Sequence, residues 1–398
     1  MEFDFWWLLI IPLVFGLGWL SARFELKLSL SNASKLPNSY FRGLNFLLNE
    51  QPDKAISAFI EIVKLDPETT ELYFALGNLF RRRGETERAI RVHQNLLNRQ
   101  DLPVLELNHA YFELGQDFLK AGLLDQAENT FMSIKSGPYK ADAQRSLLTL
   151  YQIQRDWELA IATAKVINNA DDNDAKLVIA LSHFYCELAE LALKNNSADQ
   201  ANQYLNQSIK INPSNARAIM LLGDCFILLN KIDHAIIKWS ELLESNARYL
   251  PLIAKRLLQA YETANRAQEG LDKMSSYLQT HANSDLLDSI YPSLLKTLGI
   301  EKTHELLILQ MQRYPSISSM VKLLEMLVKN NHNNANNCQI DLDLVTQFIK
   351  KSTKNLPRYI CTNCGFRARL FYWQCPGCQH WESFNFGQTK ALTPVLNV

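Results

Sequence analysis

Small residues recur along the chain at a fixed interval, set among stretches of apolar and charged residues. Gly43 and Gly77 lie 34 residues apart, and Ala55 and Ala89 are separated by the same interval. A bulky aromatic residue follows each of the two glycines three positions later. Small residues let two antiparallel helices approach closely, and aromatic side chains fill the groove between neighbouring pairs. The pattern therefore predicts a row of paired helices.

Six further units continue this register, although the signature weakens toward the carboxyl end. Their paired positions, twelve residues apart, are Gly115 and Ala127, Leu148 and Ala160, Ala189 and Ala201, Gly223 and Ala235, Leu258 and Gly270, and Tyr291 and Thr303. A repeat of about 34 residues is typical of tetratricopeptide units, whereas a generic helical bundle has no reason to keep one period. We predict six clear helix pairs and up to eight or nine in all, with a longer loop at residues 168–175, NNADDNDA.

An uncharged stretch at residues 5–22, FWWLLIIPLVFGLGWLSA, is at the short end of the lengths that cross a bilayer. A cleaved signal peptide would have basic residues before its apolar core, but Glu2 and Asp4 stand there instead. Basic residues follow the stretch between positions 23 and 35, and none precedes it. The positive-inside rule then places the carboxyl side in the cytoplasm. We predict a retained transmembrane helix.

Charge and composition narrow the function classes. Lysine plus arginine equals aspartate plus glutamate, at 41 each, so the formal net charge is zero. Whole-chain electrostatics therefore give no attraction toward polyanions, which argues against a dedicated nucleic-acid binder. Glycine (14) and proline (13) are scarce, and good helix formers dominate, so the body is predicted to be all-α. The scattered Cys186, Cys225 and Cys338 fit inert thiols in a reducing compartment.

The four remaining cysteines are clustered near the carboxyl end. Cys361 and Cys364 form one C-x-x-C pair, and Cys375 and Cys378 form a second pair after ten intervening residues. This spacing predicts a tetrahedral four-thiolate site for one metal ion, and it leaves iron and zinc as alternatives. A closed shell favours a structural ion over metal-centred hydrolysis. Two further roles stay open, an electron-carrying iron site and a zinc ribbon that binds nucleic acid.

Aromatic residues surround this cysteine cluster. We predict that Trp373 and Trp381, together with neighbouring aromatic rings, pack the small domain onto the last helices of the array. His380 would be a surplus ligand for a four-thiolate ion, and we interpret it as a surface residue.

The first helices of the repeats are expected to line the inner face of the array. Their side chains mix aromatic and hydrogen-bonding groups, which suits a groove for an extended peptide or a partner helix. The predicted groove residues in the second and third units are Phe74, Asn78, Arg81, Arg82, His109, Phe112, Gln116 and Lys120.

Composition also marks the domain boundaries. Residues 330–337, NNHNNANN, cannot bury enough apolar surface to pack, and a helix is predicted after them at 341–353. We divide the chain into a transmembrane anchor at 1–22, a juxtamembrane linker at 23–35, a tetratricopeptide solenoid at 36–330, an Asn-rich linker with one helix at 331–356, a metal-binding domain at 357–387 and a tail at 388–398.

These features, in this order, resemble the lipopolysaccharide assembly protein B family over essentially the whole chain. The most specific part of the resemblance is residues 358–381, RYICTNCGFRARLFYWQCPGCQHW, which look like the rubredoxin-like carboxyl domain of that family. The anchor, with Gly18-Trp19 followed by Arg23, and the helical repeats add to it. The resemblance implies a tetratricopeptide superhelix with a transmembrane helix before it and a small metal-binding knot after it.

For function, the resemblance implies an adaptor in the bacterial inner membrane, with a single membrane pass and the bulk of the chain facing the cytoplasm. Such an adaptor lowers lipopolysaccharide synthesis by promoting degradation of the deacetylase LpxC through the membrane protease FtsH, and it gathers other lipopolysaccharide assembly proteins. No catalytic constellation stands out in the sequence, so we predict a scaffold that is not an enzyme. The alternative is a rubredoxin-type electron-transfer protein tethered to a protein-binding solenoid. Monomer and homodimer both remain open.

Overall fold

A computed structural model of the chain describes Phe46, Lys54 and seven continuous ranges. These ranges are residues 70–100, 102–170, 174–281, 283–313, 316–330, 337–353 and 357–385. The predicted anchor at 1–22, the juxtamembrane linker at 23–35, nearly all of the first repeat and the tail at 388–398 lie outside them. Within the described ranges, no helix is both long enough and apolar enough to cross a bilayer.

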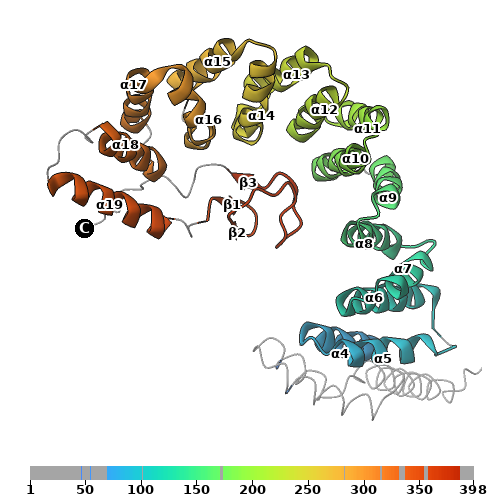
Figure 1. The fold of residues 1–398 in the computed structure, drawn as a ribbon. Helices are drawn as coiled ribbons and strands as arrows, with labels where there is room; N and C mark the ends of the chain where they lie inside the picture. Colours follow the sequence, from blue (N-terminus) through green and yellow to red (C-terminus); the bar gives the residue numbers. More distant parts are fainter. Residues whose placement is uncertain are drawn as a thin grey trace, which may run out of the picture. The chain divides into compact units, whose positions relative to one another are not determined.

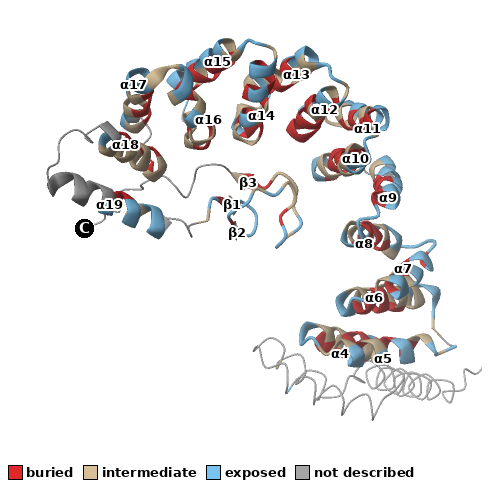
Figure 2. Cartoon of the chain, in the orientation of Figure 1, coloured by how far each residue is buried: buried red, intermediate tan, exposed pale blue. Residues whose placement is uncertain are grey.

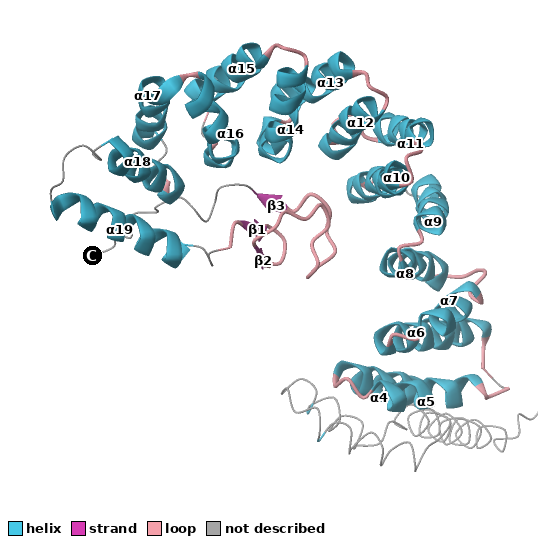
Figure 3. Cartoon of the chain, viewed as in Figure 1, coloured by secondary structure: helices cyan, strands magenta, loops and turns pink. Residues whose placement is uncertain are grey.

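The chain divides into two compact units, Met1–Gln154 and Arg155–Val398, and helices make up most of the described residues of each unit (Figures 1 and 3). Unit 1 contains α4 (Thr70–Arg82), α5 (Thr86–Leu97), α6 (Val104–Ala121), α7 (Leu124–Met132) and α8 (Tyr139–Gln154). Unit 2 contains α9 (Trp157–Ala170), α10 (Ala175–Lys194), α11 (Ala198–Ile211), α12 (Ala216–Leu228), α13 (Ile232–Ser245), the 3₁₀ helix η1 (Ala247–Tyr249), α14 (Leu250–Thr263), α15 (Ala267–Thr280), α16 (Ser284–Thr297), α17 (Gly299–Arg313), α18 (Ile317–Asn330) and α19 (Asn337–Thr353). Three short strands, β1 (Tyr359–Cys361), β2 (Arg367–Ala368) and β3 (Phe384–Asn385), complete unit 2.

Within each unit consecutive helices pack as pairs, and we call the first member of each pair helix A and the second helix B. Helices α8 and α9 carry the A and B positions of one sequence repeat but belong to different units. Helices α4, α6, α8, α10, α12, α14 and α16 carry the predicted helix A position, and the helix that follows each carries its partner position twelve residues later. The described part of the array is therefore the predicted tetratricopeptide superhelix.

Close approach explains why glycine stands in three of the A helices. A Cβ atom on Gly223 would lie 2.0 Å from Nε1 of Trp239 in the paired helix B. A Cβ atom on Gly115 would lie 2.5 Å from the ring of Phe131 in the same way. Because a real Cβ cannot approach another heavy atom so closely, only glycine lets each aromatic ring pack flat against its partner helix.

Turns between helix A and helix B repeat as regularly as the helices. Each helix A ends at a residue with positive φ, which closes the last turn of the helix. These residues are Gly84, Gly122, Arg155, Asn196, Asn230, Asn265 and Gly299. The first six lie seven residues after the small residue of helix A. Glycine and asparagine tolerate this conformation at low cost. The turn residues therefore recur with the same period as the contacts between the helices.

Polar side chains start several A helices. Asp174 accepts hydrogen bonds from the backbone N–H groups of Lys176 and Leu177 at the start of α10. Asn215 caps α12 through the N–H of Ala218 at 3.1 Å. Such caps satisfy backbone donors that have no partner within the helix, and each stabilises its helix by about 1 kcal/mol.

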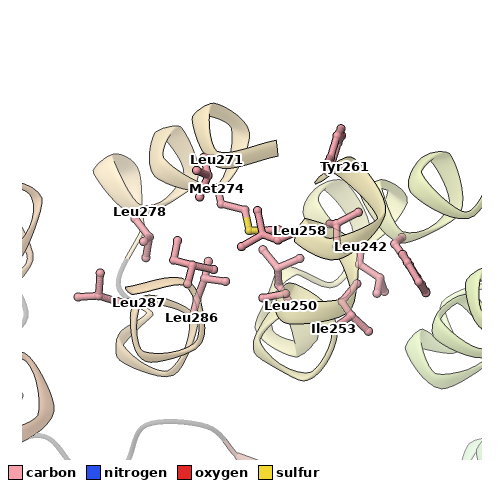
Figure 4. Close-up of a cluster of buried hydrophobic side chains, with 14 of the residues drawn as sticks. Leu242, Leu250, Ile253, Leu258, Tyr261, Leu271, Met274, Leu278, Leu286 and Leu287 are labelled. Carbon is pink, nitrogen blue, oxygen red and sulfur yellow. The ribbon is translucent and has the colours of Figure 1, made fainter. Parts of the chain in front are cut away.

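The main apolar core of unit 2 runs from α12 to α18, and a second cluster lies between α10, α11 and α12. Figure 2 shows the buried residues on the facing sides of the helices, with exposed residues on the outer sides. In Figure 4, Leu258 of α14, Met274 of α15 and Leu286 of α16 point into one cluster. Each of the three is at most 4% exposed. A core shared by neighbouring pairs makes every repeat depend on the next one, as in other solenoids.

The structure corrects two boundaries. Asn168 and Asn169, predicted to lie in a loop, belong to the last turn of α9, because that helix continues to Ala170. The helix predicted at 341–353 begins four residues earlier, at Asn337, so the asparagine-rich stretch contributes its last residue to α19. In both places low helix propensity is outweighed by continuation of an already formed helix.

Candidate metal centre and its docking surface

Residues 359–385 form a small knot whose three strands pair antiparallel in the order β2-β1-β3. Tyr359 pairs with Ala368 and Ile360 pairs with Asn385, so β1 lies in the middle. Tyr359, Ala368 and Phe384 fill its small core together with two of the cysteines. So few apolar groups cannot hold a domain of this size folded without a further cross-link.

Two similar turns present the cysteines. In the first turn, Gly365 N–H donates to the carbonyl of Cys361 at 2.9 Å, and in the second Gln379 N–H donates to the carbonyl of Cys375 at 2.8 Å. Gly365 and Gln379 both have positive φ, at 74° and 59°. Gln379 shows that the second turn adopts the same conformation even without glycine. The two C-x-x-C pairs are thus matching knuckles.

The four sulfur atoms of Cys361, Cys364, Cys375 and Cys378 fit a tetrahedral ion. All four lie within 4.8 Å of one another. The Sγ atoms of Cys361 and Cys378 are 3.7 Å apart, as are those of Cys364 and Cys375. Metal–sulfur bonds of about 2.3 Å in a tetrahedron place the sulfur atoms about 3.8 Å apart. The four cysteines are therefore positioned to bind one metal ion, which would cross-link the two knuckles.

The environment of Cys361 favours the thiolate that a metal requires. Burial would raise the pKa of this thiol, but a hydrogen bond with the Ser383 hydroxyl and contacts with the N–H groups of Cys364 and Asn363 lower it to about 6. The Cys361 and Ser383 side chains are 3.3 Å apart. A thiolate already present at neutral pH reduces the proton release that metal binding demands.

One edge of the knot packs on α10. His183, which is 0% exposed, has its Nε2 atom 3.0 Å from a carboxylate oxygen of Glu382. Its ring stacks on Trp381 with centroids 4.7 Å apart, and Phe184 meets the same indole edge-on at 6.0 Å. Burial lowers the pKa of His183, so the imidazole is neutral at neutral pH. The contact joins residues 199 positions apart in the sequence.

A second contact surface joins the knot to η1 and α16. Tyr249 lies 5.0 Å from the ring of Trp373 and 6.0 Å from that of Phe371, measured between centroids. Both rings pack against the main core of unit 2. At the edge, the Arg358 guanidinium lies 3.8 Å from the carboxylate of Asp288 in α16. The knot is therefore seated on the array through three separated elements, α10, η1 and α16, which fix its orientation.

The sequence predicted that aromatic rings pack the knot onto helices, but it named the wrong helices. Trp373 and Trp381 contact α10 and η1 rather than the last helices, because the knot returns to repeats in the middle of unit 2. His183 and Tyr249 were missed. The signal that could have found His183 is its polar ring inside the apolar run ALSHFYCELA at residues 180–189.

The predicted groove residues of unit 1 form two connected groups. Phe74 of α4 stacks on His109 of α6 at 3.9 Å, and His109 stacks on Tyr139 of α8 at 4.6 Å. Phe112 lies 5.7 Å from Tyr139, so one aromatic ladder crosses three successive A helices. Tyr139, which the sequence analysis did not select, closes the ladder.

The polar members meet in a buried cluster. Arg81 donates to Asp117 at 2.8 Å and to Glu113 and Asn78, and Asp117 also binds His93 at 2.5 Å. Gln116 donates to the Ser146 hydroxyl of α8 at 2.7 Å. Arg82 and Lys120 are exposed and stand apart from both groups. These side chains thus link neighbouring repeats, and their role in partner binding remains a prediction.

Known protein families match the helical array and the cysteine knot separately. Residues 359–385 match the family described as "Rubredoxin metal binding domain", and residues 42–96 and 186–251 match that described as "Tetratricopeptide repeat". Lipopolysaccharide assembly protein B of Escherichia coli (strain K12) is 28% identical over 377 residues, which cover 94% of this chain and 96% of that protein. The chain is thus similar to lipopolysaccharide assembly protein B over nearly the whole length of both proteins, and this similarity includes the metal-binding domain.

The lipopolysaccharide assembly protein B of Haemophilus influenzae (strain Rd) shares 27% identity over 389 residues, again with 94% of this chain and 96% of its own length covered. A solved tetratricopeptide repeat protein from Parabacteroides merdae covers 69% of this chain at 13% identity, with a TM-score of 0.35. The two lipopolysaccharide assembly protein B relatives are thus matched over nearly their whole length.

Trp381→Ala should loosen the knot from α10 while the metal stays bound. The substitution removes the ring that stacks on His183 and Phe184, and we expect the docking to weaken by about 2 kcal/mol because the indole is half-buried. Hydrogen exchange of the peptide spanning residues 178–190 should speed up at unchanged metal content. Leu370→Ala, at a 69% exposed position of the same knot, serves as the control. Unchanged exchange in Trp381→Ala would show that the stacking does not hold the knot.

Acid should weaken unit 1 through Glu113. Burial would raise the pKa of this carboxyl, but hydrogen bonds from His109 and Arg81 lower it to about 2. Since the pKa in the folded state lies below the ordinary value of 4.5, the stabilisation is complete above about pH 4.5 and is lost as the pH falls toward 2. Glu113→Gln should therefore cost up to about 3 kcal/mol at pH 7 in urea unfolding and almost nothing near pH 2. The exposed Glu87→Gln in α5 is the control, and equal losses at both pH values would refute the charge as the cause.

Proposed function

We propose that this chain is a membrane-anchored, non-catalytic adaptor that holds protein partners during lipopolysaccharide assembly. Relatives that match nearly the whole chain are named for lipopolysaccharide assembly, and tetratricopeptide arrays are protein-binding scaffolds. The resemblance supplies the partners, the protease FtsH and the deacetylase LpxC, and residues 1–22 supply the anchor in the inner membrane. The zero net charge supports protein partners over nucleic acid.

One observation carries this proposal, a cavity of about 710 Å³ at the last turns of three successive A helices. The helices are α10, α12 and α14, and most of the exposed surface that lines the cavity is apolar, although polar and charged side chains also border it. Its lining residues are Glu190, Leu193, Lys194, Asp224, Ile227, Leu228, Asn230, Ile232, Trp239, Arg256, Gln259, Ala260 and Thr263. Apolar walls with a few charged groups suit the anchoring side chain of a partner helix or peptide.

The knot leaves this cavity open. It contacts α10 at His183 and Phe184, in the middle of the helix, whereas the cavity begins at Glu190 and extends to the final residue, Lys194. Ion pairs brace the walls. Arg217 joins Glu187 and Glu190 at 2.8 and 2.7 Å, and Arg256 joins Asp224 at 2.5 Å. Because these side chains are already held in place, less conformational entropy is lost when a partner binds.

The test is affinity capture from membranes with the full chain and with Leu228→Asp. Leu228 is 47% exposed at the cavity, so a carboxylate there repels an apolar anchor without disturbing a packed core. We expect LpxC and FtsH with the unchanged chain and at least a tenfold loss of one of them with the variant. Ile237→Asp, at a 60% exposed position of α13, is the matched control. Equal recovery with Leu228→Asp would reject the cavity, and absence of both proteins from all samples would reject the adaptor.

Metal exchange separates this proposal from the electron-transfer alternative. Zinc has a single accessible oxidation state, so a zinc-loaded chain cannot shuttle electrons. If that chain captures its partners and lowers LpxC levels as the iron-loaded chain does, electron transfer is excluded. Loss of regulation in the zinc-loaded chain would instead favour the redox role.

A further inference from the structure

The last helix of the array, α19, exposes an apolar face. Leu344, Val345 and Phe348 are 59%, 49% and 71% exposed, and they lie within one turn of one another. A hollow of about 550 Å³ lies on this face and is lined by these residues with Gln347 and Lys351. Terminal elements of a solenoid ordinarily present a polar outer face to water. An apolar outer face on α19 therefore calls for a covering segment.

The inner face of α19 is already occupied. Thr346 is 2% exposed, and Lys350 pairs with Glu325 of α18 at 2.6 Å. Helix α18 thus covers the side of α19 that faces the array. Only a segment arriving from outside the array can cover Leu344 and Phe348.

Strand pairing in the knot brings the following segment toward α19. β1 comes after α19 in the chain, and β3 runs antiparallel to it, with Cys361 opposite Phe384 and Ile360 opposite Asn385. Each step forward along β3 therefore matches a step backward along β1, in the direction of α19. Asn385, the last described residue, therefore lies at the end of the knot at which the chain from α19 enters it.

The segment after β3 is also long enough to reach the apolar face of α19. Thr353, the last residue of α19, lies seven residues before Ile360, so an extended continuation of the observed register places residue 392, seven residues after Asn385, opposite it. Phe348 lies five residues before Thr353, or about 7.5 Å along the helix, which corresponds to about two extended residues. An extended segment of this length is therefore long enough for Val395 and Leu396 to contact Phe348 and Leu344.

The composition of residues 386–398, FGQTKALTPVLNV, suits this face. Ala391, Leu392, Val395 and Leu396 are apolar, and Lys390 is the single charged side chain. Pro394 disfavours a helix in this segment and favours an extended conformation at the residue before it. The other segments of unit 2 outside the described ranges are six residues or shorter, and the longest of them, residues 331–336, reads NHNNAN. It has no large apolar side chain to offer.

We propose that residues 391–396 bind in extended form across the apolar face of α19, with Val395 and Leu396 against Phe348 and Leu344. The segment closes the carboxyl end of the array. A short tether from Asn385 keeps it at an effective concentration in the millimolar range, so modest apolar contact is enough for binding. A second copy of the chain is the competing occupant of the same face.

A photoreactive p-benzoylphenylalanine at position 348 of the full-length chain tests this. Chains of natural and heavy isotope composition are mixed before irradiation, and the cross-linked peptides are identified by mass spectrometry. We expect cross-links from position 348 to residues 391–396 of the same chain. Cross-links that join light and heavy chains would assign the face to a second copy, and cross-links elsewhere or none at all would also overturn the proposal. The same group at Ile237, 60% exposed on α13, is the positional control.

Charged substitutions in the segment give an independent measurement. Val395→Asp with Leu396→Asp should reduce the yield of the cross-link about tenfold, because both carboxylates would have to be desolvated against α19. Thr389→Asp, which adds a charge outside the docking residues, should leave the yield unchanged. Equal metal content in all variants shows that the knot remains folded. A yield that survives the double substitution contradicts the apolar contact.

Discussion

Loss of the metal unfolds the knot and uncovers the aromatic surface of α10 and η1. This is the expected result of chelation, or of Cys361→Ser with Cys364→Ser. The knot has three short strands and a core of a few side chains, so nearly all of its stability comes from the ion. In comparably small zinc domains, metal binding contributes about 10 kcal/mol to the free energy of folding. The few apolar contacts within residues 359–385 cannot supply that amount.

Two measurements detect the effect of metal loss. The fluorescence of Trp373 and Trp381 should shift to the red as both indoles leave Tyr249 and His183, and hydrogen exchange should quicken in α10. Helix content should fall little, because the array keeps its own core. Cys225→Ala, which removes a buried thiol remote from the knot, is the control and should show no red shift. Re-addition of zinc should reverse the shift. Unchanged exchange in α10 after metal loss would show that the knot does not stabilise the array.

Gly223→Ala should destabilise unit 2 by about 3–5 kcal/mol. The new methyl group would meet Trp239 Nε1 at 2.0 Å, and the ring has no room to move because Trp239 is 1% exposed. Any shift also breaks the hydrogen bond that the indole N–H donates to the Met220 carbonyl at 2.9 Å. Overpacking and an unsatisfied buried donor therefore act together. Urea unfolding followed by tryptophan fluorescence measures the loss.

A double substitution tests the cause. Trp239→Leu removes the ring that the new methyl group would strike, so Gly223→Ala should cost much less in that background than in the unchanged chain. Ile237→Ala lies in the same helix B, at a 60% exposed position, and should change the unfolding free energy by less than about 0.5 kcal/mol. If the two losses of the double variant simply add, the steric explanation fails.

Local and periodic features were predictable from the sequence. The spacing of twelve residues between Gly223 and Ala235 recurs in every described pair from α4 to α17, because each pair meets the same packing problem. The metal site of the four cysteines was equally predictable, since each C-x-x-C turn is determined by about five consecutive residues. The predicted anchor at 1–22 lies outside the described residues and stays a prediction.

Contacts between distant elements were not predictable in the same way. His183 reads as a polar residue within an apolar helix, and such a residue looks the same whether it faces helix B or the knot. No sequence pattern near Tyr249 indicates that it contacts Trp373, because the two residues are far apart in the chain and belong to no common repeat. The inner face of unit 1 shows a related effect. Arg81 reads as a free basic group, whereas Glu113 and Asp117, 32 and 36 residues further along, engage it.

The contact between His183 and Glu382 also sets an order of events during synthesis. The two residues are 199 positions apart, and a ribosome adds roughly 5–20 residues per second, so the second follows the first by roughly 10–40 s. During that time the helices of unit 2 can pair, but the indoles of Trp381 and Trp373, which pack against Phe184 and Tyr249, have not yet been made. The nascent chain therefore carries an exposed aromatic surface until its final residues emerge. A chain that terminates before Cys361 would keep that surface and present it to chaperones and proteases.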